Sequence, residues 1–462
     1  MNIPSIVSIS PLTGRYAKKV QKLLEDSASE FALIKARILV EIEWLIFLSE
    51  GPKCFILPDE EKNKLRDIHK EFSVRNAEEI KEIEKKTNHD VKAVEYFLKE
   101  RLPKSYRTFV HYGLTSEDTD NLARAIITRD QLEVLLKCAK QVSEALWELQ
   151  DENRGTVMLA LTHGQPALPT TLGKEISVYT RRIDDLRRVI GNGYNLDVKC
   201  AGAVGTMASF NLINPHYDWI VGLTAFTKTI DERTKPSESI CDIRFRFRLE
   251  VTQIKPHDDF AAIFHSIVEL NTVLVGFCQD IWWYISREVF LQKPKDGDEV
   301  GSSTMPQKIN PINFENAEAH LGLANALFNH FAQTLPISRF QRHLSDSAIQ
   351  RYFGEAVAMS VIAYENIIAG LRKLTVNVEG MKKELEDHPE ILAEAYQLIL
   401  KKNDIENGYE IMKDFFRGKK LSKEEILLKI DSLIVPDHVR VEMKQVTVFN
   451  YLGNAKMIAG EY

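Results

Sequence analysis

Residues 258–292 read DDFAAIFHSIVELNTVLVGFCQDIWWYISREVFLQ and contain no proline. Apolar side chains recur in this stretch at the spacing of one helix face, at Ile263, Ile267, Leu270, Leu274, Phe277 and Ile281. A helix over the whole stretch would be about 50 Å long, far longer than an average globular helix. The same stripe occurs over 172–190, and helical periodicity also marks 122–150, 317–334 and 355–373. Because each stripe must be buried against another helix, the sequence predicts an all-α, mainly helical fold with a central bundle of long helices.

The two ends of the chain carry shorter periodic segments than its centre. Breaks fall at Gly51-Pro52 and Leu102-Pro103 on one side, and at Pro389, Gly408 and Pro436 on the other. We therefore expect a three-domain subunit: an N-terminal helical domain over 1–110, a central long-helix bundle over 111–365, and a C-terminal helical domain over 366–462.

The composition excludes several classes of protein. With 462 residues, a formal net charge of −6 and 44% hydrophobic residues, the chain is ordinary for a globular protein and unlike a disordered one. The acidic balance argues against a nucleic-acid partner. No uninterrupted apolar run approaches the ~18–20 residues that cross a bilayer, and no basic segment precedes an apolar block at the N-terminus, so we expect no membrane partner and no signal peptide. The cysteines never form a CxxC pair, which predicts reduced thiols in a cytoplasmic protein: Cys54, Cys138, Cys200, Cys241 and Cys278.

One stretch departs from the helical pattern. In residues 243–251, IRFRFRLEV, apolar and charged side chains alternate strictly, which is typical of a half-buried strand. Interleaved arginine and phenylalanine also suits a nucleic-acid platform. The acidic chain favours the strand, with its arginines facing solvent.

A long polar loop lies between two of the expected helices. Its sequence is QKPKDGDEV over 292–300 and GSSTMPQKINP over 301–311, with one lysine and two serines in the second part. Loops of more than about 12 residues without regular structure are commonly lids, binding loops or mobile segments. Composition alone leaves a binding loop and a mobile surface loop equally open.

The pattern Gly-Ser-Ser-x-Met-Pro-x-Lys-x-Asn-Pro resembles the signature loop of the fumarase/aspartase superfamily, whose members eliminate fumarate or reverse that reaction. The resemblance extends along nearly the whole chain and is to the branch that acts on succinylated purine nucleotides, in its longer bacterial form. The supporting segments are GRY at 14–16, TNHDVKAVEYF at 87–97, TSED at 115–118, THGQPA at 162–167, SRFQR at 338–342 and DS at 346–347. The resemblance implies a three-domain helical subunit in a homotetramer.

The implied reaction is β-elimination of fumarate from a succinylated purine nucleotide, leaving AMP. The same branch removes the succinyl group from an aminoimidazole carboxamide ribotide in purine biosynthesis. This chemistry needs a base beside a carboxylate, a cation for the resulting aci-carboxylate, and an acid for the departing nitrogen. It needs no metal and no redox cofactor, and the histidines form no HExxH or Cys/His cluster.

The resemblance assigns four catalytic positions: Ser302 as base, His163 as acid, Lys308 as the cation, and Glu315 as the carboxylate that orients His163. A serine alkoxide needs backbone N–H groups and a nearby cation in a site shielded from water, which makes loop closure chemically necessary. Taken singly, Ser302 is an ordinary loop serine, His163 belongs to a turn before a helix near Thr170, and Glu315 is a charge in a first helical turn. Only the resemblance favours the catalytic interpretation.

The resemblance also assigns the substrate-binding positions. Arg342, Ser347 and Arg351 match phosphate-binding residues, and two guanidiniums suit a phosphate dianion. Thr115 and Ser116 match the residues for the succinyl carboxylate. The remaining matched positions are Arg15, Tyr16, Asn88, His89, Asp90, Gln253, Ser303, Asn310 and Asn316. Either Asn88 or Asp90 is alternatively the N-cap of a helix over 91–100.

The chain departs from its relatives at three places. Gln307 stands where His or Tyr is frequent, Leu161 stands where Arg is frequent, and the region 206–251 is longer. Three other functions remain as alternatives: a different fumarate-releasing enzyme such as argininosuccinate lyase or aspartase, a non-catalytic structural protein on this fold, and a serine hydrolase. The phosphate group speaks against the first, retention of all four catalytic positions against the second, and the lack of a nucleophile elbow against the third. Because the matched segments are far apart along long helices, we expect the active site to be shared between subunits.

Overall fold

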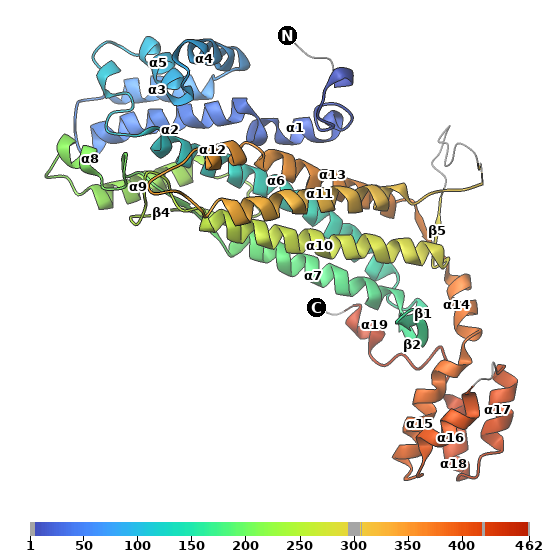
Figure 1. Ribbon diagram of the computed structural model, residues 1–462. Coiled ribbons are helices and arrows are strands. Elements are labelled where there is room, and N and C mark those ends of the chain that lie inside the picture. The colour runs from blue at the N-terminus through green and yellow to red at the C-terminus, as the bar shows by residue number, and fades with distance from the viewer. Residues whose placement is uncertain (1–4, 294–304, 306, 418–420, 461–462) are drawn as a thin grey trace. The chain divides into compact units, whose positions relative to one another are not determined.

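In a computed structural model, which describes residues 5–293, 305, 307–417 and 421–460, the protein is mainly helical, as the sequence predicts (Figure 1). The helices are α1 Ala17–Ala28, α2 Glu30–Glu50, α3 Asp59–Lys70, α4 Val74–Thr87, α5 Asp90–Arg101, α6 Ser116–Glu152, α7 Leu172–Asn192, α8 Ala208–Ile213, α9 Trp219–Thr234, α10 Asp258–Ser286, α11 Ile312–Thr334, α12 Ser345–Gln350, α13 Phe353–Leu371, α14 Val378–Glu386, α15 Ala393–Lys402, α16 Gly408–Phe416, α17 Lys423–Asp431, α18 Asp437–Gln445 and α19 Ala455–Ile458. The strands are β1 Val157–Thr162, β2 Gln165–Thr171, β3 Asn195–Val198, β4 Arg244–Phe247, β5 Phe290–Gln292 and β6 Leu374–Val376.

The chain divides into two compact units, each assembled from separate stretches. The first contains residues 1–140, 185–275 and 317–365, and the second contains residues 141–184, 276–316 and 366–462. The boundaries fall inside five of the longer helices, α6, α7, α10, α11 and α13. The three successive domains expected from the sequence do not coincide with these two units. The three-domain division stays a prediction.

The apolar stripe of α10 is buried as predicted. Ile263, Ile267, Leu270, Leu274, Phe277 and Ile281 are each 0% exposed. Within the first unit, Phe264 of α10 packs against Phe328 and Phe331 of α11 and Phe353 of α13, with ring centroids 4.8–5.8 Å apart. Long helices with one wholly apolar face therefore form the core, because burying each aromatic side chain contributes roughly 1.5–3 kcal/mol.

The helix α10 is shorter than predicted. It ends at Ser286 instead of continuing to Gln292, because Glu288 has a left-handed backbone with φ of 59°. Residues Phe290–Gln292 then form β5, which pairs antiparallel with β6. By length and composition alone α10 could cross a membrane, with a mean hydropathy of 1.6 over 18 residues, of which 61% are buried. Core helices of globular proteins have the same character, so this is weak evidence for a membrane span.

The N-terminal helices form their own core within the first unit. The helix α2 packs against α3, α4 and α5 (blue to cyan in Figure 1), and Ile38, Ile42 and Phe97 lie at the centre of their apolar cluster. The cap of α2 is Ser29, whose hydroxyl accepts from the Ala32 N–H at 3.1 Å. Three charged side chains of α2 are also buried, which requires partners for them.

The predicted strand over 243–251 is present but shorter, as β4. It pairs in parallel with β3, and Phe245 is buried. Its arginines are partly exposed and ion-paired: Arg246 and Arg248 lie 2.6 and 2.9 Å from the carboxylate of Asp197. The Arg129 guanidinium lies 4.3 Å from the ring centre of Phe245. The alternating pattern is therefore explained by packing and ion pairs within this unit.

The C-terminal helices α15 to α18 form a second apolar cluster, inside the second unit. Tyr396, Leu400, Ile430 and Met443 are among its buried members, together with Leu159 of β1. The helix α17 begins with a reciprocal capping box between Ser422 and Glu425. The second unit thus combines these helices with the β1–β2 hairpin.

Candidate active site

The two serines of the signature loop, Ser302 and Ser303, lie outside the residues that the structure describes. Of the predicted residues in this loop, the structure describes Lys308 and Asn310. Lys308 is exposed, and its backbone N–H donates to the Met305 carbonyl at 3.0 Å. The assignments of Ser302, Ser303 and Lys308 stay predictions.

Asp90 and Arg351 are brought together in the first unit. The Arg351 guanidinium lies 3.4 Å from the Asp90 carboxylate, which also accepts from Arg37 at 2.7 Å. Arg37 is 1% exposed and bonds in addition to Asp120 of α6. Burial opposes ionisation of Asp90, but Arg37, the Val91 N–H and Arg351 together hold the pKa of Asp90 below its usual value. An ionised carboxylate therefore holds Arg351 beside α5.

The segment from Asn88 to Asp90 forms the junction between α4 and α5. Asn88 ends α4 with a left-handed backbone, φ 49°. The N-cap of α5 is His89, whose Nδ1 accepts from the Lys92 N–H at 3.3 Å, and neither sequence candidate occupies that position. Asp90 is the first residue of the helix and accepts from the Val91 N–H at 2.9 Å. Half of the His89 side chain stays exposed, at 51%.

Arg342 lies beside Gln253 and beside the start of α6. Its guanidinium is 3.5 Å from the Gln253 side-chain oxygen and 3.3 Å from the Glu117 carboxylate. Thr115 and Ser116 immediately precede Glu117, so three predicted binding segments meet here. Ala203, Val204, Gln253, Gln341, Arg342, His343 and Leu344 line a cavity of about 470 Å³ at this place.

Glu117 is a buried carboxyl with a raised pKa. Burial, with the nearby carboxylates of Asp120 and Asp346, raises its pKa to about 8, although Arg342 opposes the shift. Perturbed carboxyl groups of this kind gather at functional sites. Burial therefore favours the protonated form of Glu117, which weakens its attraction for Arg342.

The other predicted phosphate and nucleotide positions lie elsewhere in the first unit. Ser347 is in α12, and Arg351 follows as its C-cap in helical conformation, with φ −69° and ψ −17°, so both keep the predicted four-residue helical spacing. Arg15 is exposed just before α1. The Tyr16 ring packs edge-on against the His320 ring, with centroids 4.8 Å apart.

His163 occupies the tip of a β-hairpin in the second unit, where the sequence predicted only a turn before a helix. β1 and β2 pair antiparallel from Val157↔Thr171 to Thr162↔Gln165, leaving His163 and Gly164 as the two-residue loop. Both loop residues have positive φ, 54° and 72°, the geometry of a type I′ hairpin turn. His163 is exposed, and its imidazole makes no hydrogen bond or ion pair with any described residue.

Glu315 contacts a different partner from the one predicted by resemblance. Its carboxylate accepts from the Trp282 Nε1–H at 3.2 Å, and no described hydrogen bond joins it to His163. Asn316 accepts from Asn366, which in turn accepts from Asn313, at 3.0 and 3.3 Å. The single chain therefore orders Glu315 and Asn316 without involving the hairpin, and the role of Glu315 stays a prediction.

The sequence analysis did not identify Arg37 and Glu117. In the structure Arg37 contacts Asp90, and Glu117 contacts Arg342. A signal for Arg37 exists, because a charge among the largely apolar residues of α2 requires a partner when it is buried. Glu117 stands within the quoted TSED segment, but no sequence pattern gives its burial.

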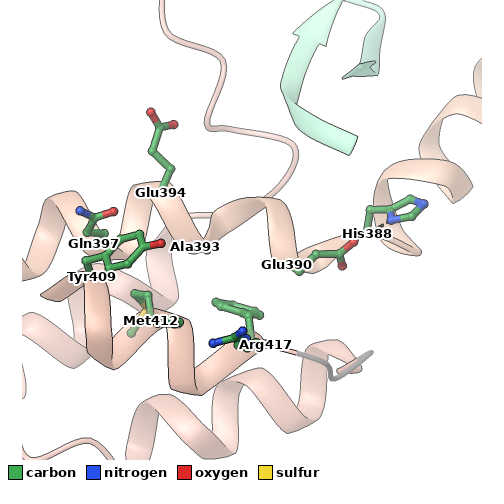
Figure 2. Close-up of a pocket in the computed structure, with 10 residues that line it drawn as sticks. His388, Glu390, Ala393, Glu394, Gln397, Tyr409, Met412 and Arg417 are labelled. Atoms are coloured by element: carbon green, nitrogen blue, oxygen red, sulfur yellow. Dashed lines mark hydrogen bonds and ion pairs between the residues drawn. The ribbon is translucent and has the colours of Figure 1, made fainter. Parts of the chain in front are cut away.

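A larger cavity, of about 750 Å³, lies in the second unit between α15 and α16. Figure 2 shows Glu394 and Gln397 on α15, Tyr409 and Met412 on α16, and the paired His388 and Glu390 at 2.8 Å. None of the predicted site residues lines it.

Comparison with known proteins identifies the family. Residues 59–324 match the family described as lyase, and residues 338–452 match the family described as adenylosuccinate lyase C-terminal. The adenylosuccinate lyase of Dictyostelium discoideum is 39% identical over 98% of both chains, and that of Escherichia coli K12 is 36% identical over 100% of both. The chain belongs to the adenylosuccinate lyase family. It is therefore a lyase, within the fumarase/aspartase superfamily that the signature loop indicates.

Solved structures confirm the fold of this adenylosuccinate lyase family member. A fumarate lyase from Mesorhizobium sp. BNC1 superposes with a TM-score of 0.75 at 16% identity, covering 96% of this chain and 97% of that one. The β-carboxy-cis,cis-muconate cycloisomerase of Acinetobacter calcoaceticus sp. ADP1 gives 0.70 at 18% identity, covering 96% and 98%. At such identities the likeness concerns the fold alone.

Proposed function

We propose that this protein cleaves adenylosuccinate by β-elimination, releasing fumarate and leaving AMP. The observation that carries the proposal is the full-length similarity, 36–39% over at least 98% of the chain, to adenylosuccinate lyases of D. discoideum and E. coli. We extend it to the succinylated aminoimidazole carboxamide ribotide, because the same succinyl arm and phosphate are present in that molecule. The cell compartment in this proposal is the cytoplasm.

The proposed chemistry uses the four positions given by the resemblance. Ser302 takes the proton from the carbon beside a succinyl carboxylate, and Lys308 stabilises the negative charge that develops there. His163 protonates the departing nitrogen, and Glu315 keeps the imidazole in the protonated form. Since His163 is exposed at a hairpin tip and unpartnered among the described residues of its own chain, its orienting carboxylate belongs to another subunit in this account.

The proposed assembly is a homotetramer with active sites shared between subunits. Two observations support it. His163 lacks a partner within the described chain, although a general acid needs one to fix its ring. Among the described residues, the side chain of Glu315 hydrogen-bonds to Trp282 alone, on a helix surface with exposed apolar residues such as Leu323 at 56%.

The phosphate-binding assignment gives a direct test of substrate class. Adenylosuccinate and its dephosphorylated nucleoside differ only in the group that Arg342, Ser347 and Arg351 would bind. Because charge-assisted hydrogen bonds contribute about 1.5–3 kcal/mol each, we expect kcat/KM to favour the nucleotide by at least about 10²-fold. Initial rates on both compounds measure this ratio.

The matched variants are Arg342→Gln and Arg351→Gln, with Arg188→Gln as control. Arg188 is an exposed arginine paired with Asp185 on α7. The first two should reduce the preference for the nucleotide, and the control should leave it unchanged. Equal rates on nucleotide and nucleoside in the parent protein would remove the phosphate assignment and favour a lyase for a substrate without phosphate.

A further inference from the structure

We propose that the buried ion pair of Asp118 and Lys199 is a positioning device that holds the substrate-binding segments around Thr115 and Gln253 against each other. The Lys199 Nζ lies 2.9 Å from Asp118 Oδ1, and both side chains are 0% exposed. Neither residue can touch the substrate from there. The inference rests on the proposed function, which assigns substrate contacts to Thr115, Ser116 and Gln253.

Asp118 ties the start of α6 to the segment after β3. Its carboxylate accepts from the backbone N–H of Thr115 at 2.9 Å, of Ala201 at 2.9 Å and of Gly202 at 3.1 Å. Thr115 and Gly202 are far apart in sequence, so one carboxylate fixes the distance between two loops. Hydrogen bonds to an ionised acceptor are about twice as strong as neutral ones, which makes this junction stiff.

Lys199 ties the same junction to the segment that carries Gln253. Its ammonium donates to the carbonyls of Gln253 at 2.6 Å and Gly202 at 3.0 Å, besides the contact with Asp118. The ammonium thus makes two hydrogen bonds to carbonyls and one ion pair. The Lys199 backbone N–H donates in addition to Asn121 Oδ1 of α6 at 2.7 Å. Three segments of the first unit therefore meet at one ion pair.

The segments that the ion pair binds continue into the wall of the cavity lined by Arg342. Gly202 is followed by Ala203 and Val204, which line this cavity together with Gln253. The Gln253 side chain reaches the Arg342 guanidinium. Shifting the backbone at Gly202 or Gln253 therefore moves the cavity wall and Arg342 with it.

Stability alone does not explain such a pair. Taking two charges out of water is costly, and apolar replacements for buried ion pairs are often neutral or stabilising. The pair instead fixes the relative positions of the segments that it joins. Its five backbone hydrogen bonds all go to segments that bear proposed substrate contacts or line the cavity.

The test compares steady-state kinetics on adenylosuccinate for the parent, Asp118→Asn, Lys199→Met and the control Arg129→Met. Arg129 forms a similarly buried pair with Asp231, 1% and 7% exposed and at 2.5 Å, that joins α6 to α9 and makes no hydrogen bond to Thr115, Gly202 or Gln253. Since a misplacement of about 1 Å can cost about 10²-fold, we expect kcat/KM of the first two variants to fall by that order, with KM raised at least about tenfold. Arg129→Met should keep the parental KM.

The KM separates positioning from mere folding. A purely structural role would reduce the folded fraction, which lowers apparent kcat and leaves KM unchanged. A parental KM in a folded Asp118→Asn or Lys199→Met variant overturns the inference, as does an equal rise in Arg129→Met. Should Lys199→Met fail to fold, the nearly isosteric Asp118→Asn decides. If neither folds while Arg129→Met does, the pair is a folding requirement and the positioning role is overturned. An inactive parent overturns the proposed function itself, and this inference with it.

Discussion

His163 lies at a position where a purely structural histidine would contribute little to the stability of the fold. It is exposed, it occupies a left-handed backbone conformation with φ of 54°, and no described residue contacts its imidazole through a hydrogen bond. A positive φ is what a two-residue type I′ turn requires at this position, and it places the imidazole at the tip of the hairpin. The exposure and the lack of a partner are both consistent with an acid that meets its substrate at the hairpin tip.

Replacing the proposed acid or base should therefore affect turnover far more than folding. We expect His163→Ala and Ser302→Ala each to reduce kcat on adenylosuccinate by at least about 10²-fold, the low end for losing a positioned acid or base. Thermal unfolding of His163→Ala should match that of the parent, since the side chain is exposed. A variant with near-normal turnover would remove its residue from the mechanism.

Glu117 gives the protein a specific pH dependence. Its folded-state pKa of about 8 lies above the ordinary value of about 4.3 for an unfolded chain, mainly because the carboxyl is buried. The folded state thus binds the proton more tightly, so this contribution to stability is complete below about pH 4.3 and is lost as the pH rises through 8. Urea unfolding at fixed pH values should show a shallower fall in unfolding free energy between pH 5 and 8 for Glu117→Gln. Identical slopes for parent and variant would contradict the burial-raised pKa.

At the scale of single elements, the loop from Gly202 to Gly205 depends on its glycines. Gly205 has φ of +74°, and a Cβ added there would lie 2.2 Å from the Val251 carbonyl oxygen and 2.9 Å from that of Thr252. Backbone cannot move aside as a flexible side chain can. The loop over 202–205 therefore packs directly against the backbone of Val251 and Thr252, the two residues before Gln253.

Two alanine substitutions should consequently have opposite effects. Gly205→Ala should lower the unfolding free energy by about 1–3 kcal/mol, because it combines a left-handed backbone with a clash. Gly322→Ala, in the middle of α11 with open space around the added Cβ, should raise it by up to about 1 kcal/mol through helix propensity. Chemical denaturation measures both. A Gly205→Ala protein as stable as the parent would contradict the described loop geometry.

The helices were predictable and the hairpin was not, for reasons specific to each. A stripe such as Ile263–Ile281 has one period over many residues, and a single face of it must be buried. Residues 157–171 lack a usable period, and Pro166 and Pro169 argue against a strand, although the observed β2 contains both. The only local signal was the pair His163-Gly164, a two-residue loop whose positive φ values become visible only in the structure.

The site was predictable only in part. The resemblance supplied its residues, and the structure joins Asp90 to Arg351 and Gln253 to Arg342. No periodicity could predict that Arg37 bonds to Asp90 or that Glu117 lies against Arg342. Both contacts depend on burial between segments that are far apart in sequence. Contacts between subunits cannot be predicted from the periodicity of one chain either.

At the scale of the whole molecule, a shared active site predicts that two inactive variants repair each other. Mixing Ser302→Ala with His163→Ala under conditions that exchange subunits should restore activity, because some sites then combine an intact base from one chain with an intact acid from another. Each variant subjected alone to the same exchange is the control. Mixed and separate samples with equal activity would contradict sharing between subunits.

The account as a whole depends on one reaction, and product analysis tests it most directly. Purified protein is incubated with adenylosuccinate, and in parallel with argininosuccinate and with aspartate, and the products are quantified by the nucleotide absorbance and by mass spectrometry. The account predicts one AMP and one fumarate for each adenylosuccinate consumed, and no fumarate from the other two compounds. Unchanged adenylosuccinate, or fumarate released only from argininosuccinate or aspartate, would contradict it.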